Sequence, residues 1–144
     1  MNSDMGLCGA VVNFTPPTAS DTCDFTLVST HAPNSFFPIG ETIVIYTATD
    51  TAGNFAQSSF SITISDNELP TFAGCPVSLT VDADAGSCGA SVGASEGYVP
   101  PIATDNCSVN VLSTHNPGQF FPVGVTTVTY TASDSSGNLG MCSF

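Results

Sequence analysis

FFPIGETIVIYTATDTAGN occupies residues 36–54 and returns as FFPVGVTTVTYTASDSSGN at residues 120–138, an offset of 84 residues. A stretch of this length that occurs twice predicts a tandem repeat architecture. In the second copy Val128, Tyr130 and Ala132 alternate with threonine and serine. This period of two predicts a strand with one buried face and one hydroxyl-bearing face. The segment Asp134–Asn138 that follows predicts a tight hairpin turn with Gly137 at positive φ.

The composition favours an all-β chain with many turns. Glycine, proline, serine and threonine are abundant, and long apolar stripes at helical spacing are absent. The 144 residues suffice for two small domains, and the apolar fraction of 42% suffices for two small cores.

The charge is extreme, with 12 acidic residues, no Lys or Arg and a net charge of −12. Nucleic acids and anionic membrane surfaces are therefore disfavoured partners, because both are bound through cationic side chains. No apolar run approaches the ~20 residues that cross a bilayer, so we expect no membrane insertion. Six cysteines in so short a chain indicate an oxidising compartment. The first residues carry no signal-peptide pattern, so we expect a signal already removed or a piece of a longer secreted chain.

The repeats predict domain boundaries. We expect a first repeat at residues 1–65, a short acidic linker at 66–70 and a second repeat at 71–144. The second repeat carries four extra residues in the loop 91–98, and we expect its first strand at Val77–Val81. The second strand of the repeated hairpin is expected at Phe55–Ser65 in the first copy.

Several shared motifs resemble one known family. CGAVVNFTPPTASDTC in the first repeat matches the second repeat's CGA and PPIATDNC, and the long hairpin stretch and the CSF of residues 142–144 complete the pattern. The chain resembles two tandem hyalin-type (HYR) repeats, which are extracellular immunoglobulin-like modules. The resemblance implies two tandem immunoglobulin-like β-sandwiches, an extracellular location, secreted or at the cell surface, an adhesive or structural role, and no enzymatic activity.

The repeat restricts how the cysteines pair. The equivalent positions predict one bond inside each repeat, and the remaining two cysteines then pair with each other. Ser58 stands at the position equivalent to Cys142, and this agrees with a third bond in the second repeat alone. Zinc binding is the rival interpretation, and the absence of any CxxC pair disfavours it. The predicted disulfides are Cys8–Cys23, Cys88–Cys107 and Cys75–Cys142.

No cofactor is required by this sequence, but acidic residues near the junction suggest calcium, which prefers oxygen ligands. The alternative is that such clusters arise by chance in a chain this acidic. The candidate ligands are Asp66, Asn67, Glu68, Asp82 and Asp84.

Two sequons, at Asn13 and Asn106, predict covalent glycans. Asn13 alternates with apolar neighbours and should point outward, whereas Asn106 adjoins a cysteine. Ile43 and Ile45 stand where the second repeat has threonine on its outer face, which suggests a contact surface. The alternative to glycans is a bare polar surface. The alternative to a contact surface at Ile43 and Ile45 is that a loop of the same repeat covers them.

Both repeats are expected to be incomplete at the chain ends. The first lacks the strand that Val77–Val81 supplies in the second, and the second stops at Phe144, before the counterparts of Ile62 and Ile64. We expect adjoining repeats, or copies of the chain placed head to tail, to cover these edges, with Phe144 at the contact. Ends that simply fray are the alternative. The resulting hypothesis is a structural module of a disulfide-stapled, glycosylated fibre or array, and the alternative is an adhesion module for a protein or glycan ligand.

Overall fold

The computed structural model describes residues 1–144, which divide into two compact units, Met1–Asn67 and Glu68–Phe144. The chain is built from strands and contains no α-helix, which confirms the predicted all-β fold. No helix is long and apolar enough to cross a membrane. The residues predicted as a linker, 66–70, are divided between the two units.

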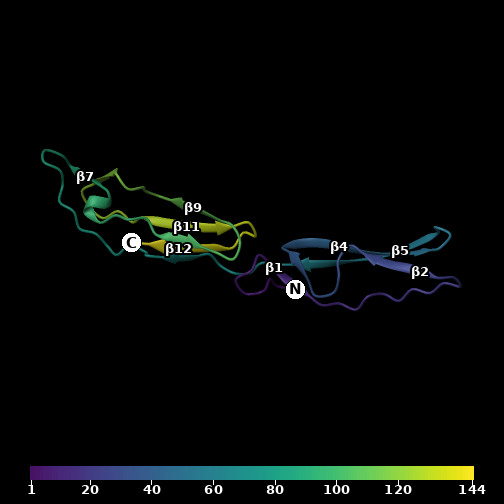
Figure 1. Ribbon diagram of the computed structural model, residues 1–144. Coiled ribbons are helices and arrows are strands. Elements are labelled where there is room, and N and C mark those ends of the chain that lie inside the picture. Colours follow the sequence, from purple (N-terminus) through teal and green to yellow (C-terminus); the bar gives the residue numbers. More distant parts are fainter. The chain divides into compact units, whose positions relative to one another are not determined.

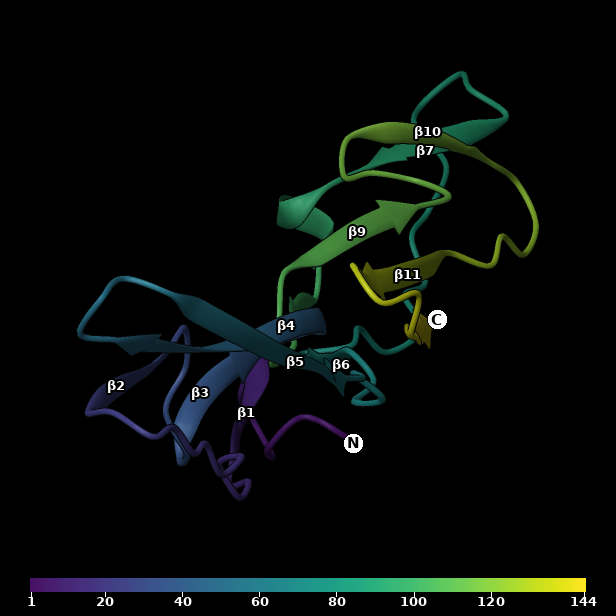
Figure 2. The ribbon, with the colours of Figure 1, turned by 90° about the vertical axis from the view of Figure 1, so that its right-hand side faces the viewer.

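The first unit consists of two antiparallel sheets (Figures 1 and 2). One pairs β1 (Gly9–Val12) with β3 (Ser35–Pro38). The other has the order β2–β4–β5, and Figure 1 shows its three strands side by side. Its members are β2 (Phe25–Ser29), β4 (Gly40–Asp50) and β5 (Phe55–Ile64).

The core of the first unit lies between these two sheets. Ala10, Val12 and Phe37 come from the β1–β3 sheet, and Val44, Tyr46 and Ile64 come from β4 and β5. Alternate residues of β4 are buried, as the period of two predicts, so each sheet supplies one apolar face. Two sheets that pack in this way form a β-sandwich.

The second unit repeats this plan. Its two main sheets are β7–β10 and β12–β11–β9, with an additional pair β6–β8. The core contains Ala90, Val92, Tyr98, Val128, Tyr130 and Cys142. The elements are β6 (Thr71–Ala73), β7 (Gly89–Val92), the 3₁₀ turn η1 (Ala94–Glu96), β8 (Ile102–Thr104), β9 (Val109–Ser113), β10 (Gln119–Pro122), β11 (Thr129–Asp134) and β12 (Leu139–Ser143).

The Cys-Gly-Ala motif has a steric explanation. A Cβ on Gly9 would lie 2.4 Å from the carbonyl oxygen of Phe37, and one on Gly89 would lie 2.2 Å from that of Phe121. Only glycine lets the two strands of this sheet approach so closely.

The predicted hairpin turns are present and have the same hydrogen bonds in both repeats. Asp50 Oδ1 accepts the backbone N–H groups of Ala52 and Asn54, both at 2.8 Å, and Asp50 Oδ2 accepts the Asn54 side chain at 2.7 Å. Asp134 makes the equivalent bonds with Ser136 and Asn138. Gly53 and Gly137 have φ values of 89° and 90°. A side chain that replaces backbone partners in this way fixes the turn and hence the register of the hairpin.

One substitution between the repeats changes the polar content of the core. Tyr98 and Phe14 occupy equivalent places, since each packs edge-on against the aromatic rings of Phe121 and Phe144 or of Phe37 and Phe60. The hydroxyl of Tyr98 lies 2.9 Å from that of Tyr130 and donates to the carbonyl of His115. The hydroxyl of Tyr46, the counterpart of Tyr130, is buried without a partner because Phe14 has no hydroxyl. Burial and the bond to Tyr130 raise the pKa of Tyr98 to about 12.

We predict that Phe14→Tyr stabilises the first unit. The new hydroxyl reaches Tyr46 and removes an unsatisfied buried donor, which should raise the free energy of unfolding by about 1 kcal/mol and the melting temperature by about 4–8 °C. Thermal unfolding followed by circular dichroism measures this. The gain should vanish in a Tyr46→Phe background, and a lower melting temperature for Phe14→Tyr would contradict the assignment.

We also predict a shared acid transition. Hydrogen bonds from Asn54 hold the pKa of Asp50 below its ordinary value. At Asp134 desolvation acts to raise the pKa, but the hydrogen bonds from Asn138 and the turn backbone together lower it. The stability that these carboxylates provide is present above the unfolded pKa of about 3.9 and is lost as the pH falls through the lower folded pKa. At pH values below about 4 the melting temperature should therefore decrease as the pH is lowered. The decrease should be less steep in the Asp50→Asn/Asp134→Asn variant than in the unmodified chain. If the melting temperature depends on pH in the same way in the unmodified chain and in the variant, the two turns do not contribute to the acid transition.

Candidate functional site

The second unit contains a groove of about 810 Å³. It lies between residues 78–83 on one side and residues 121–128 on the other. Leu79, Tyr98, Val128 and Phe144 are among the side chains that line it, and all four belong to the core cluster of this unit. The groove therefore opens directly onto the core.

The predicted strand at Val77–Val81 is wrong, because these residues form no ladder. Leu79 packs on the core, whereas Val77 is 78% exposed. The segment has no partner strand, and without one the alternation of side chains does not produce a sheet. The first strand of the second unit is instead β6, at Thr71–Ala73.

In the first unit, the place that corresponds to the groove is filled by residues of that unit. The end of β5 and Ser65 lie beside the first residues, and Asn2 and Ser65 form a parallel bridge. Ser3 N donates to Ser65 O at 2.9 Å, and Ser65 N donates to Met1 O at 2.9 Å. Ile64 is only 1% exposed.

The difference is visible in the length of one strand. β4 has 11 residues, whereas β11, its counterpart, has 6. In β4 the first residues pair with Ser61–Ile64 of β5. Residues 124–127 of the second unit have no such ladder, and Val125 is fully exposed. β11 is accordingly shorter than β4.

The first unit has an opening of its own, of about 370 Å³, lined by residues 17–21 and by Tyr46, Ala48 and Ser58 among others. In the second unit the corresponding place is covered by the segment that contains β6. There Phe72 packs edge-on against Tyr130 with ring centroids 6.5 Å apart, and the backbone of Pro70 lies against Gly140.

The disulfide between Cys75 and Cys142 is present as predicted, with Cα atoms 6.0 Å apart. It ties the segment after β6 to β12. Its absence from the first unit agrees with Ser58 at the position of Cys142.

The predicted bonds Cys8–Cys23 and Cys88–Cys107 are wrong. Cys23 and Cys88 are exposed free thiols, whereas Cys8 and Cys107 are disulfide-bonded.

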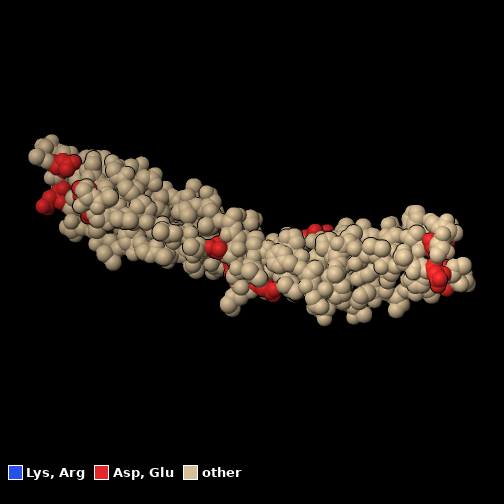
Figure 3. Space-filling view, in the orientation of Figure 1, with Lys and Arg blue, Asp and Glu red and all other residues tan.

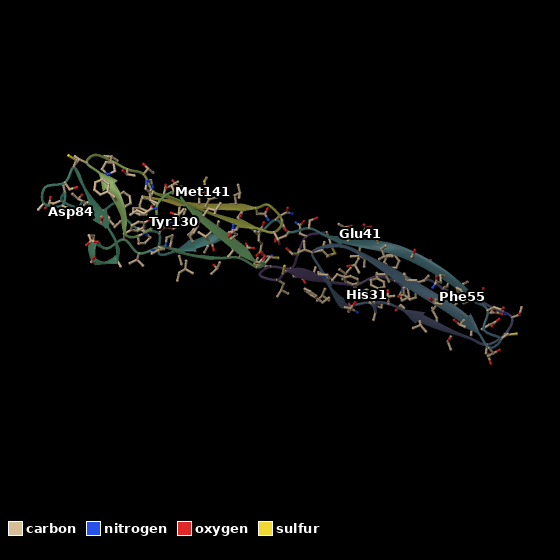
Figure 4. The ribbon with its side chains drawn as sticks, turned by 90° about the horizontal axis from the view of Figure 1, so that it is seen from above. His31, Glu41, Phe55, Asp84, Tyr130 and Met141 are labelled. Atoms are coloured by element: carbon tan, nitrogen blue, oxygen red, sulfur yellow. A yellow bond between two sulfur atoms is a disulfide. The ribbon has the colours of Figure 1, made fainter.

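The length of β4 explains why the two cysteines of one repeat do not meet. Cys8 precedes Gly9, which pairs with Pro38 just before β4 begins, and Cys23 precedes Phe25, which pairs with Asp50 where β4 ends. The two ends of this strand are roughly 30 Å apart at ~3.3 Å per residue, and Glu41 and Phe55 mark them in Figure 4. A disulfide requires Cα atoms within about 7 Å.

The acidic residues occupy loops and strand ends. Every Asp and Glu lies outside the strands or within two residues of a strand terminus, and Figure 3 shows the red atoms in a few clusters with broad uncharged areas between them. The strand faces of both units are consequently neutral, although the chain carries a net charge of −12.

The candidate calcium ligands do not form one group within the second unit. Glu68, Asp82 and Asp84 belong to no cluster of three potential ligands there. Asp84 Oδ2 instead accepts the Ser91 N–H at 3.2 Å, just as Asp4 Oδ2 accepts the Val11 N–H at 2.9 Å. Figure 4 places Asp84 in the loop before β7. Asp66 is buried, and Asn67 donates to the Asn2 side chain at 2.9 Å. Calcium binding stays a prediction.

The sequons differ in exposure, since Asn13 is exposed and Asn106 is half-buried. Ile43 is 57% exposed and Ile45 is half-buried, on the outer face of β4. Phe144 is half-buried and packs on Tyr98 with ring centroids 5.4 Å apart.

Two equivalent aliphatic residues on the outer faces were not predicted from the sequence. Val28 is opposite Thr47, and Leu112 is opposite Thr131, so both point away from the core, and both are well exposed. The signal was available, because Leu27-Val28 and Val111-Leu112 each interrupt the alternation with two consecutive apolar residues.

The two histidines pack against aromatic rings. The rings of His31 and His115 lie 5.1 Å from those of Phe37 and Phe121, and each has its Nδ1 near the hydroxyl of the preceding threonine.

Comparison with known proteins identifies the family. The HYR domain profile matches residues 2–64 and again residues 65–144. The chain belongs to the HYR domain family. It is 39% identical to the hyalin of Lytechinus variegatus over 94% of its own length and 40% identical to that of Strongylocentrotus purpuratus, again over 94%. It is also 36% identical, over 92% of its length, to the sushi, von Willebrand factor type A, EGF and pentraxin domain-containing protein 1 of Rattus norvegicus. The HYR chain spans only 26%, 11% and 4% of these relatives, respectively.

We predict that a thiol reagent applied to the isolated, folded and unreduced HYR chain labels two cysteines, Cys23 and Cys88. Peptide mapping by mass spectrometry identifies the modified positions. The Cys75–Cys142 peptide pair should remain linked until a reductant is added. Labelling of Cys8 or Cys107 in place of Cys23 and Cys88 would contradict the observed thiol states.

Proposed function

We propose that this chain is a structural and adhesive module of an extracellular array of HYR repeats and has no enzymatic activity. The observation that carries the proposal is the uncharged outer face that both units share. These faces carry hydroxyl groups with a few aliphatic side chains, while the charges lie in loops and at strand ends. Neutral faces approach one another without desolvating charge, and scattered aliphatic residues supply contact area.

An extracellular location, secreted or at the cell surface, agrees with the cysteine content and with membership in the HYR family. The exposed side chain of Asn13 suits it as a glycan acceptor in such a location. Asn106 is the second candidate acceptor.

The thiol states favour partners that are themselves HYR repeats. Cys88 is the counterpart of Cys8, and Cys23 is the counterpart of Cys107, yet one member of each pair is bonded and the other is free. The backbone around the two equivalent cysteines is held in the same way, because Cys23 N and Cys107 N each donate to an aspartate two residues earlier, at 2.9 and 3.1 Å. We infer that Cys23 and Cys88 form disulfides with cysteines of neighbouring repeats. Each bond releases two protons and two electrons, and a disulfide oxidant takes them up to become two thiols.

Adhesion to a protein or glycan ligand is the second candidate function, and it would depend on calcium if the junction carboxylates bind that ion. The exposed aliphatic side chains on the outer faces favour it. The two functions differ in what binds to these faces, namely a second HYR module or an unrelated ligand.

We predict that the chain self-associates with increasing concentration and that Ile43→Thr/Ile45→Thr weakens the association at least about tenfold, since two aliphatic contacts are lost. Sedimentation velocity over a concentration series measures this. Thr47→Ser/Ser59→Thr changes the same face without removing aliphatic area and should have little effect. A chain that stays monomeric throughout the series would contradict the array and favour the adhesion function. Loss of ligand binding on addition of a calcium chelator would then show that adhesion depends on calcium.

A further inference from the structure

We propose that the outer face of the β1–β3 sheet is a binding site for the N-acetylglucosamine core of a glycan attached to Asn13. This inference rests on the proposed function, because it takes Asn13 as the glycan acceptor suggested there. It is tested on the stability of a single chain, so its failure is distinguishable from a failure of the chains to associate.

The side chains of Val11 and Asn13 lie on the same outer face. The residues that alternate with them face the interior, since Ala10 and Val12 are buried and Phe14 packs on the core cluster. Val11 and Asn13 are both exposed. Successive outward residues of a strand are about 7 Å apart, so the first sugar on Asn13 begins beside the Val11 side chain.

The neighbouring strand β3 adds an aromatic ring to this face. Phe36 is opposite Val11, and β1 and β3 lie side by side in Figure 2. A Cβ on Gly9 would lie 2.3 Å from Phe36 Cζ, so the ring lies over the Gly9 backbone. The Phe36 side chain is nevertheless 49% exposed, because only one side of the ring is covered in this way. Asn13, Val11 and the ring of Phe36 therefore follow one another along the surface of the sheet.

The chemistry of this strip suits an uncharged sugar. The core of an N-linked glycan begins with two linked N-acetylglucosamine rings, which carry no charge and present axial C–H groups and acetyl methyl groups. The face of an aromatic ring is weakly negative and attracts such C–H groups, and an aliphatic side chain gains from the buried apolar area. The first sugar ring then covers Val11 and the second reaches Phe36, while the sugar hydroxyls remain in water.

The second unit has the aromatic ring but neither of the other two components. Phe120 lies over the equivalent glycine and is 54% exposed, so the exposure of this ring is common to both units. Ser91 stands at the position of Val11, and Gly93 stands at the position of Asn13. The cover that the ring gives to glycine explains the phenylalanine in both units. It does not explain why the exposed valine and the glycan acceptor occur together in one unit and are absent together from the other.

A protein partner fits this face less well than the glycan. A glycan on Asn13 is bulky and is attached beside Val11, so it would lie between the sheet and a second module that approached this face. The covalent link also gives the sugar a high effective concentration at the strip, so a contact that is weak for a free sugar can form. The outer face of β4, with Ile43 and Ile45, belongs to the other sheet and stays open for contacts between modules.

The test compares glycoforms of the full chain, secreted from cells that add N-linked glycans and measured at a concentration at which it is monomeric. All forms carry Ser108→Ala, which leaves Asn13 in the only sequon. The chain is measured with its glycan, with the glycan trimmed by mannosidases to its two N-acetylglucosamine residues, and as Thr15→Ala, which has no sequon. We expect both glycosylated forms to melt about 3–6 °C above Thr15→Ala.

Two substitutions locate the contact. Val11→Ser gives the first unit the residue of the second, and Phe36→Leu keeps an apolar cover over Gly9 without an aromatic face. Each should reduce the melting-temperature gain from the glycan by about half or more, whereas Ile43→Thr, on the other sheet, should leave it unchanged. In proton NMR spectra the ring of Phe36 should shift sugar C–H resonances upfield, and Phe36→Leu should abolish this shift.

Three results would overturn the proposal. Peptide mapping could find Asn13 of the secreted chain unmodified. The gain in melting temperature could be the same in the unsubstituted chain, Val11→Ser and Phe36→Leu, which would mean that the glycan stabilises the unit without touching this face. The gain could also disappear when the glycan is trimmed to its core, which would assign it to the outer sugars.

Discussion

The pairing of backbone groups along one long hairpin is the constraint on which each repeat depends. In the first unit β4 is bonded over its whole length, to β2 at one end and to β5 from end to end. The core residues Val44 and Tyr46 lie on its inner face and are held against the β1–β3 sheet by that ladder. Where the ladder stops early, as at Val128 in the second unit, the strand stops with it and the core opens to solvent. A buried or half-buried backbone group without a partner is costly, so strand length follows from the partner available and not from propensity alone.

Much of this plan could be predicted from the sequence, because it is local and repeated. The alternation around Tyr130, the Asx-bonded turn at Asp134 and the strand at Phe25–Ser29 all follow from residue types at short spacing. The Cys75–Cys142 bond could be predicted as well, since both members are absent from the first repeat together.

The errors have a common physical cause. Val77–Val81 has the alternation of a strand, but alternation does not supply a partner, and none lies beside it. The pairing of Cys8 with Cys23 assumed that equivalent cysteines close within their repeat, whereas β4 holds their positions far apart. The groove between residues 78–83 and 121–128 could not be located from residue types, because its two walls are distant in sequence. The hydroxyl that Tyr46 leaves unsatisfied likewise depends on a residue more than thirty positions away, Phe14.

The central claim is that the long hairpin strand of each unit is ordered only as far as a partner segment pairs with it. Hydrogen exchange of the unmodified chain, measured by mass spectrometry on peptides from both hairpins, tests this claim most directly. Residues 40–43 should exchange slowly and their counterparts 124–127 should exchange at nearly the rate of an open chain, while residues 45–50 and 129–134 should be protected to a similar degree. Equal protection of 40–43 and 124–127 would contradict the claim.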